Sequence, residues 1–136
     1  AAESPFFAAD RELERIKAYA DLIFVDFHAE ATSEKIALGY YLDGRVTAVF
    51  GTHTHVQTAD SKIMPKGTGY ISDLGMTGPA VSVLGLEKQT IIDRFLNSMP
   101  QKFTVANSRG QFCAAMFEID DATRKVTSIE RIYKEL

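Results

Sequence analysis

Cysteine is nearly absent from the chain, and long apolar runs and clusters of basic residues are absent altogether. Cys113 is the single cysteine, which excludes an intrachain disulfide and is typical of a reducing compartment. No segment approaches the roughly 18 apolar residues that span a bilayer, and the first residues lack the basic start and apolar core of a signal peptide. These features predict a cytoplasmic protein without a membrane partner.

The composition narrows the class of protein without naming a function. The 136 residues carry a net charge of −3, and 46% of them are hydrophobic, so we expect one globular domain over residues 1–136. Lysine and arginine are dispersed along the chain, which argues against binding to a nucleic-acid backbone. Cys113 falls inside a predicted strand, and we interpret it as a packing residue.

Histidine is also scarce, and its three copies stand at two points. His28 follows residues 22–27, and His53 and His55 follow residues 46–50, two mostly apolar runs. Both runs predict buried strands, whose ends are common positions for sites in α/β folds. If residues 53–55 are extended, His53 and His55 project to the same side, about 7 Å apart at Cβ. The spacing is compatible with structural histidines, with one zinc held by three histidines, or with part of a two-metal cluster completed by carboxylates.

The hydrophobic pattern predicts an α/β fold whose mixed sheet ends in an antiparallel meander. Residues 22–50 form a strand, a helix and a strand, which predicts a right-handed parallel crossover with the histidines at its carboxyl edge. Ile36, Tyr40 and Tyr41 are expected on the buried face of that helix. A glycine-rich segment, residues 75–79, is interpreted as a connection with positive φ angles. We expect helices at 8–20, 32–43 and 87–97, a hairpin of 62–64 with 69–72, and meander strands at 103–106, 111–119 and 126–133.

Four segments resemble the YmdB-like branch of the calcineurin-type metallophosphoesterase family. They are residues 26–35 (DFHAEATSEK), 43–46 (DGRV), 51–60 (GTHTHVQTAD) and 73–79 (DLGMTGP). The resemblance runs from about residue 5 to the C-terminus. It implies an α/β/β/α sandwich whose strand ends hold two transition metal ions, with iron or manganese expected first and zinc as an alternative. By motif, His28 and His53 would bind one ion and His55 the other. A hydroxide on the metals would then attack a small phosphodiester, such as a 2′,3′-cyclic nucleotide.

The chain departs from the family pattern in its first half. It contains no early Gly-Asp element, no Glu-Asn bridging element and no Gly-Asn-His block with the catalytic acid. We therefore expect the C-terminal half of the enzyme, with no catalytic residue of its own and little or no hydrolysis in isolation. Its expected partners are the N-terminal half and a small phosphodiester, and a second copy of the chain is an alternative cover for exposed surface. Because the chain begins without methionine, we expect a terminus made by processing, proteolysis or design.

Two other functions remain open at this stage. The first is an enzyme with a single zinc held by His28, His53 and His55. The second is a non-catalytic interaction module that keeps the family scaffold. A histidine-triad nucleotide hydrolase is rejected, because Gln57 stands where a further histidine is needed.

Overall fold

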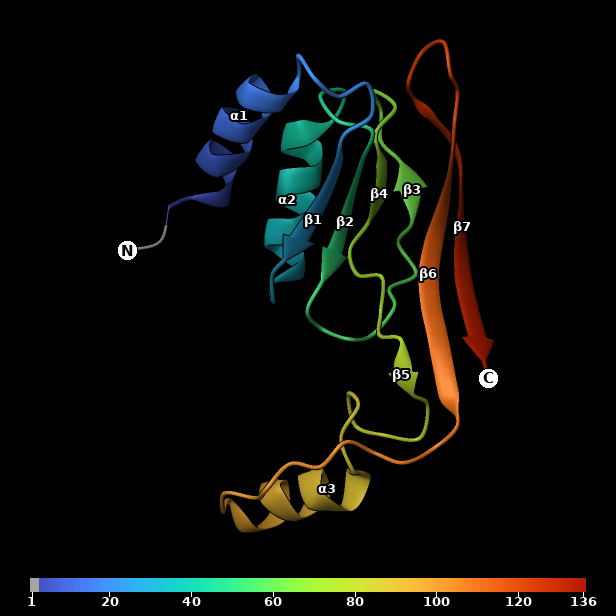
Figure 1. Cartoon of the computed structure of the whole chain (residues 1–136). Helices are drawn as coiled ribbons and strands as arrows, with labels where there is room; N and C mark the ends of the chain where they lie inside the picture. The colour runs from blue at the N-terminus through green and yellow to red at the C-terminus, as the bar shows by residue number, and fades with distance from the viewer. Residues whose placement is uncertain (1–2) are drawn as a thin grey trace.

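The computed structural model describes residues 3–136, in which two helices, a mixed sheet and an antiparallel sheet form three layers (Figure 1). The α/β class is confirmed, with one helical layer and two sheets of the expected sandwich among these residues. None of the helices in this part of the chain is both long and apolar enough to cross a membrane. The elements are α1 (Pro5–Ile16), β1 (Phe24–His28), α2 (Thr32–Leu42), β2 (Ala48–Thr52), β3 (Lys62–Ile63), β4 (Gly69–Ile71), β5 (Gly78–Pro79), α3 (Lys88–Asn97), β6 (Gly110–Ile119) and β7 (Val126–Glu135).

The mixed sheet has the order β1-β2-β4-β3. Strand β1 pairs parallel with β2, as the crossover predicts, and β2 pairs parallel with β4. Strands β3 and β4 form the expected antiparallel hairpin. The apolar run before His28 was expected to be a buried strand, and this is wrong, because β1 lies at the edge of the sheet. Its side chains alternate between exposed and half-buried, and Phe24 is 47% exposed.

The helical layer packs on the mixed sheet through a different face of α2 than expected. Tyr40 and Tyr41 are exposed, while Leu38 and Leu42 are buried in the core with Tyr70 of β4. The physical reason is Gly39, because a side chain there would collide with the Tyr70 ring. The aromatic ring of β4 occupies the space next to the backbone of α2, and this sets the rotation of the helix. The first helix also begins earlier than expected, with Pro5 at its first turn.

The second sheet has the order β5-β6-β7, and all of its pairings are antiparallel. It packs on the mixed sheet where Gly69 of β4 meets Phe117 and Val126. The predicted strand at residues 103–106 is wrong, since only an isolated bridge joins Val105 to Leu86 there. Val105 is 75% exposed and only Ala106 of this stretch is buried, and β5 takes the place beside β6.

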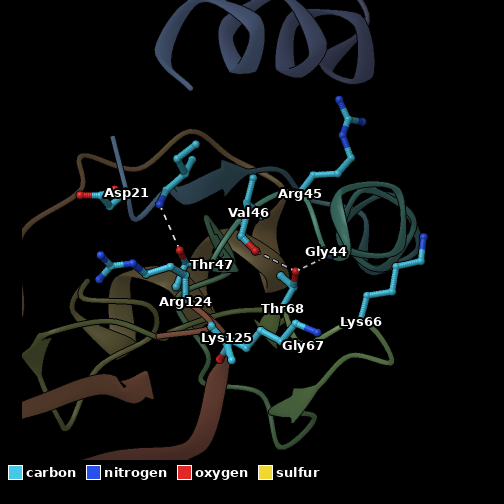
Figure 2. A pocket seen from close by; sticks show the side chains of 12 residues that line it. Asp21, Gly44, Arg45, Val46, Thr47, Lys66, Gly67, Thr68, Arg124 and Lys125 are labelled. Atoms are coloured by element: carbon cyan, nitrogen blue, oxygen red, sulfur yellow. Dashed lines mark hydrogen bonds between the residues drawn. The ribbon is translucent and has the colours of Figure 1, made fainter. Parts of the chain in front are cut away.

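A basic hollow lies at the amino ends of the parallel strands, and the histidines lie at the opposite, carboxyl ends. The Thr68 hydroxyl accepts a hydrogen bond from the Gly44 backbone N–H and donates one to the Val46 carbonyl (Figure 2). A cavity of about 160 Å³ lies beside these bonds. Arg45 at its rim is paired with Asp10. The cations in the lining are Arg45, Lys66, Arg124 and Lys125.

Candidate metal centre at the carboxyl ends of β1 and β2

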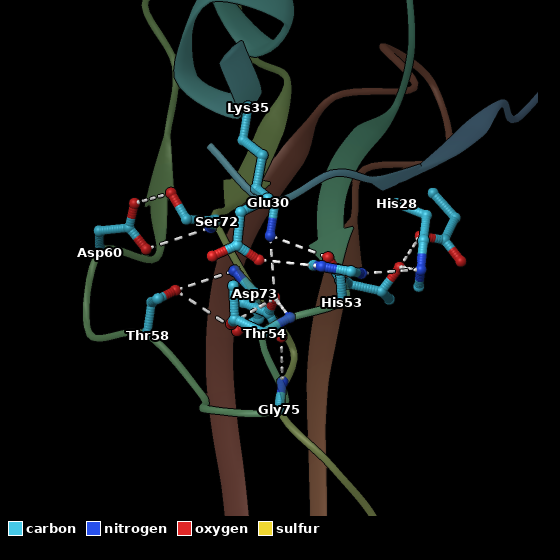
Figure 3. A network of polar contacts seen from close by, with 12 residues as sticks. His28, Glu30, Lys35, His53, Thr54, Thr58, Asp60, Ser72, Asp73 and Gly75 are labelled. Atoms are coloured by element: carbon cyan, nitrogen blue, oxygen red, sulfur yellow. Dashed lines mark hydrogen bonds and ion pairs between the residues drawn. The ribbon is translucent and has the colours of Figure 1, made fainter. Parts of the chain in front are cut away.

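The parallel register of β1 and β2 brings two of the three histidines together. His28 is the last residue of β1 and pairs with Thr52, the residue before His53. Nε2 of His28 lies 3.1 Å from Nδ1 of His53, and the two rings are nearly perpendicular (Figure 3). Residues 25 positions apart therefore present nitrogen atoms to the same point at the edge of the sheet.

Neighbouring oxygens fix where the protons of these two imidazoles lie. The Thr52 hydroxyl donates to Oδ1 of Asp26, so its oxygen accepts from Nδ1–H of His28, at 3.0 Å. Nε2 of His53 faces Oε2 of Glu30 at 2.9 Å and donates to it. When both rings are neutral, as in metal ligation, this arrangement leaves lone pairs on Nε2 of His28 and Nδ1 of His53 that point at each other. A cation between them removes this repulsion, so the donor set fits a transition metal ion.

His55 takes a different direction from His53. The φ angles are 105° at His53 and 65° at His55, so residues 53–55 are not extended and the condition for a same-side projection is not met. Nδ1–H of His55 donates to the Leu84 carbonyl at 3.2 Å, which leaves Nε2 free to bind a ligand. Residues other than glycine rarely adopt such positive φ angles, and residues with a strained backbone cluster at functional sites.

A buried ion pair holds the backbone between the two histidines. The side chains of Lys35 and Asp73 are 3% and 1% exposed, with Nζ 2.9 Å from Oδ2. Asp73 also accepts hydrogen bonds from the backbone N–H and the hydroxyl of Thr54. Lys35 donates in turn to the Thr52 carbonyl. The pair therefore fixes the residue before His53 and the residue after it.

Two carboxyl groups in this network have pKa values below the ordinary 3.8. Burial by itself would raise the pKa of Asp73, but hydrogen bonds from Lys35, Gly75 and Thr54 outweigh it. Burial opposes the shift at Asp60 too, where hydrogen bonds from Ser72 and Thr58 lower the pKa. Both groups are therefore carboxylates near neutral pH and hold the ends of β4 and the following loop through charge-assisted bonds.

The candidate site is incomplete within the described residues. No group of three or more His, Cys, Asp or Glu side chains between residues 3 and 136 lies close enough to hold a metal ion by itself. His28 and His53 meet, while His55 is held by Leu84 in another loop. This geometry gives no support to one zinc held by all three histidines. Lys35 and Asp73 were missed by the sequence argument, although both lie inside segments that carry the family resemblance.

Comparisons with known proteins match this arrangement to a family. A family model described as YmdB-like protein matches residues 1–132. The chain belongs to the YmdB-like family. It is 53% identical over 130 residues to a Bacillus subtilis protein named 2′,3′-cyclic-nucleotide 2′-phosphodiesterase, and the match covers 96% of this chain and 49% of that protein. The chain thus spans about half the length of this YmdB-like relative.

Two solved structures share the fold of this YmdB-like chain. A phosphatase from Mycoplasma pneumoniae is similar with a TM-score of 0.92 and 41% sequence identity, over 99% of this chain and 48% of that one. A hypothetical protein from Thermus thermophilus is similar with a TM-score of 0.90 and 45% identity, over 98% and 51% of the two chains. The expected family and fold class are confirmed by these matches.

Proposed function

We propose that this chain supplies the three-histidine part of a dinuclear, metal-dependent phosphodiesterase. Its substrate would be a small phosphodiester such as a 2′,3′-cyclic nucleotide, in line with the name of the Bacillus subtilis relative. The observation that carries the proposal is the pair of imidazole nitrogens, His28 Nε2 and His53 Nδ1, facing each other at 3.1 Å while the second nitrogen of each ring contacts Thr52 or Glu30.

In this proposal each histidine has a ligand role and the surrounding residues orient it. His28 and His53 would hold one metal ion through Nε2 and Nδ1, and His55 would hold the second through Nε2. Two such ions, iron or manganese first and zinc as an alternative, would lower the pKa of a water molecule and neutralise charge on the phosphodiester. Asp26 and Thr52 fix the His28 ring, and the Leu84 carbonyl fixes the His55 ring. Such outer contacts set the tautomer and orientation of metal ligands.

The missing ligands would come from the other half of the enzyme. We propose that this half packs against β1, where one edge of the mixed sheet is unpaired among the described residues. An apolar cavity of about 390 Å³ lies along the same edge, between α1 and β1. The chain alone would then bind metal weakly and show little or no hydrolysis, and the catalytic acid would lie in the other half.

The test combines metal analysis with a hydrolysis assay. The purified chain, alone and mixed with the remaining half of the Bacillus subtilis relative, is examined for bound metal by elemental analysis and for 2′,3′-cyclic AMP hydrolysis. We expect two metal ions and hydrolysis only in the mixture. His28→Ala, His53→Ala and His55→Ala should each lower the metal content and reduce the rate by at least about 100-fold, as loss of metal-site groups does.

Tyr19→Ala is the matched control, because Tyr19 is 88% exposed and precedes β1, whose opposite end carries His28. It should change neither the metal content nor the rate. A mixture that binds another protein tightly but holds no metal, with no effect of the three substitutions, would reject the phosphodiesterase and favour the interaction module.

A further inference from the structure

A half-open cavity lies directly beside His55. Its volume is about 360 Å³, within the range of small-molecule sites, which begins near 300 Å³. The segment after His55, the loop after Gly75 and the hairpin of β6 and β7 each contribute to its walls. The lining residues with side chains suited to a flat ligand are Val56, Met76, Leu84, Gln111 and Tyr133.

We propose that this cavity binds the base of a nucleotide and so selects nucleotide substrates for the neighbouring metal centre. This inference rests on the proposed phosphodiesterase function and names the part of the chain that recognises the substrate. A base in the cavity would place its ribose and cyclic phosphate toward His55, which forms one wall.

The walls of the cavity suit an aromatic ring. Tyr133 is 53% exposed and offers a ring for stacking, which binds any base because every base has a π face. Met76 brings a polarisable thioether, a group that makes favourable contacts with aromatic rings. Leu84 completes an apolar wall and is 50% exposed. Burial of these side chains by a base removes apolar surface from water.

Gln111 adds a polar group that can tell bases apart. Its Nε2 donates to the Met76 carbonyl at 3.1 Å, and this bond fixes which end of the amide is the oxygen. Within residues 3–136 Oε1 receives no hydrogen bond, so it remains an acceptor. Adenine and cytosine carry an exocyclic amino group that can donate to it, whereas uracil presents a carbonyl at the same position. We therefore expect adenine or cytosine to bind better than uracil.

The turn that carries Leu84 is held by its own hydrogen bonds. Ser82 donates through its hydroxyl to the Pro79 carbonyl and accepts from the Gly85 backbone N–H. Leu84 has a φ of 52° and Gly85 a φ of 96°, the left-handed conformations of a tight turn. The same turn directs the Leu84 carbonyl at Nδ1 of His55. Base binding and the orientation of His55 therefore share one preformed turn, and preorganised walls favour binding.

The test uses methionine methyl groups as reporters and requires neither metal nor hydrolysis. The chain has four methionines, and their methyl groups are labelled with ¹³C. The labelled chain is then titrated separately with adenosine, uridine and ribose while NMR spectra are recorded. We expect adenosine to shift the Met76 methyl through its ring current. The buried Met64 and the exposed Met99 should not move, and ribose should shift none of them.

Two variants sharpen the result. Gln111→Leu should weaken adenosine binding by about fivefold to tenfold, the effect of one neutral hydrogen bond, and should remove the preference over uridine. Tyr133→Leu should weaken both nucleosides. Phe103→Leu, in the loop after α3, is the control and should change neither.

An unmoved Met76 methyl at millimolar adenosine overturns the proposal, provided that the Met64 methyl keeps the shift of a buried group and so reports a folded chain. That outcome would leave metal binding and hydrolysis by the mixed halves untouched. The converse outcome is that the chain binds adenosine while its mixture with the remaining half of the relative holds no metal. That result would support the base site and reject the phosphodiesterase.

Discussion

Gly51 is the residue on which the approach of β2 to the end of β4 depends. Its carbonyl accepts a hydrogen bond from the Leu74 backbone N–H. A Cβ at this position would overlap the Ser72 carbonyl oxygen and would lie 2.8 Å from Cδ of Lys35. The backbone oxygen cannot move away without breaking the sheet, so a methyl group here forces the strands apart just before His53.

We expect Gly51→Ala to lower the free energy of unfolding by about 1–3 kcal/mol or more, as overpacking does. Urea denaturation followed by circular dichroism measures this change. Gly110→Ala is the matched control, because the nearest atom outside its chain neighbours would lie 3.6 Å from the new Cβ, an ordinary contact. Equal stability of the two variants would show that the close approach at Gly51 can relax without cost.

Residues differ in how far the sequence reveals them. The histidines were found because they are rare and follow strands, and two of them do meet. Lys35 and Asp73 look like an exposed helix residue and a turn residue, since lysine and aspartate are seldom fully buried. Only the tertiary contact between α2 and the end of β4 buries them. The turned backbone at His53 and His55 also depends on that contact, so alternation along the chain could not predict it.

At the scale of elements, local sequence patterns predicted which strands pair better than they predicted which side chains are buried. The crossover of β1, α2 and β2 and the hairpin of β3 and β4 follow from apolar runs and turn residues, and both are confirmed. Of the three residues expected on the buried face of α2, Ile36 packs against the core, whereas Tyr40 and Tyr41 are exposed although they are apolar enough to suggest a core. Their neighbours α1 and Lys62 contact them at the rim instead, where the Tyr41 ring meets Phe6 edge to face and the Tyr41 hydroxyl donates to Asp10.

The loop from β2 to β3 and the end of β4 form a unit that depends on two carboxylates. The folded-state pKa values of Asp60 and Asp73 lie below 3.8, so in acid the unfolded chain binds more protons than the folded chain. Their contribution to stability is therefore complete above the unfolded pKa and is lost as the pH falls through the folded values.

We expect these two groups to leave the urea midpoint unchanged between pH 7 and about pH 5. At pH values lower than about 4, the urea midpoint should decrease. Asp73→Asn should lower stability at neutral pH and flatten the acid part of the curve. Asp121→Asn, in the exposed turn before β7, serves as the control and should leave the curve unchanged. An Asp73→Asn chain with the same acid slope as the control would contradict the assignment.

For the whole molecule, the exposed edge of β1 is the feature that bears on assembly. An unpaired edge strand beside an apolar cavity is a template for another strand, and the proposed partner is the remaining half of the enzyme. In the mixture with the remaining half of the Bacillus subtilis relative, we expect backbone amides of residues 24–28 that do not bond to β2 to gain protection from hydrogen exchange. Mass spectrometry measures this gain.

Phe24→Pro should reduce the gain, because the Phe24 N–H faces away from β2 in this register and proline removes that donor. Amides in β6 and β7 serve as the internal control and should exchange equally with and without the partner. Protection of β1 that rises with the concentration of this chain alone would instead assign the edge to a second copy.

The backbone conformation of His53 lowers the stability of the fold at a residue of the candidate site. At a φ of 105° a β-carbon is crowded by the adjacent peptide groups, and glycine adopts this angle without strain. Heat resistance and the imidazole therefore make opposite demands on one position. A library of variants selected only for survival at high temperature would accumulate glycine at residue 53, so the chain would gain stability and lose the nitrogen that faces His28.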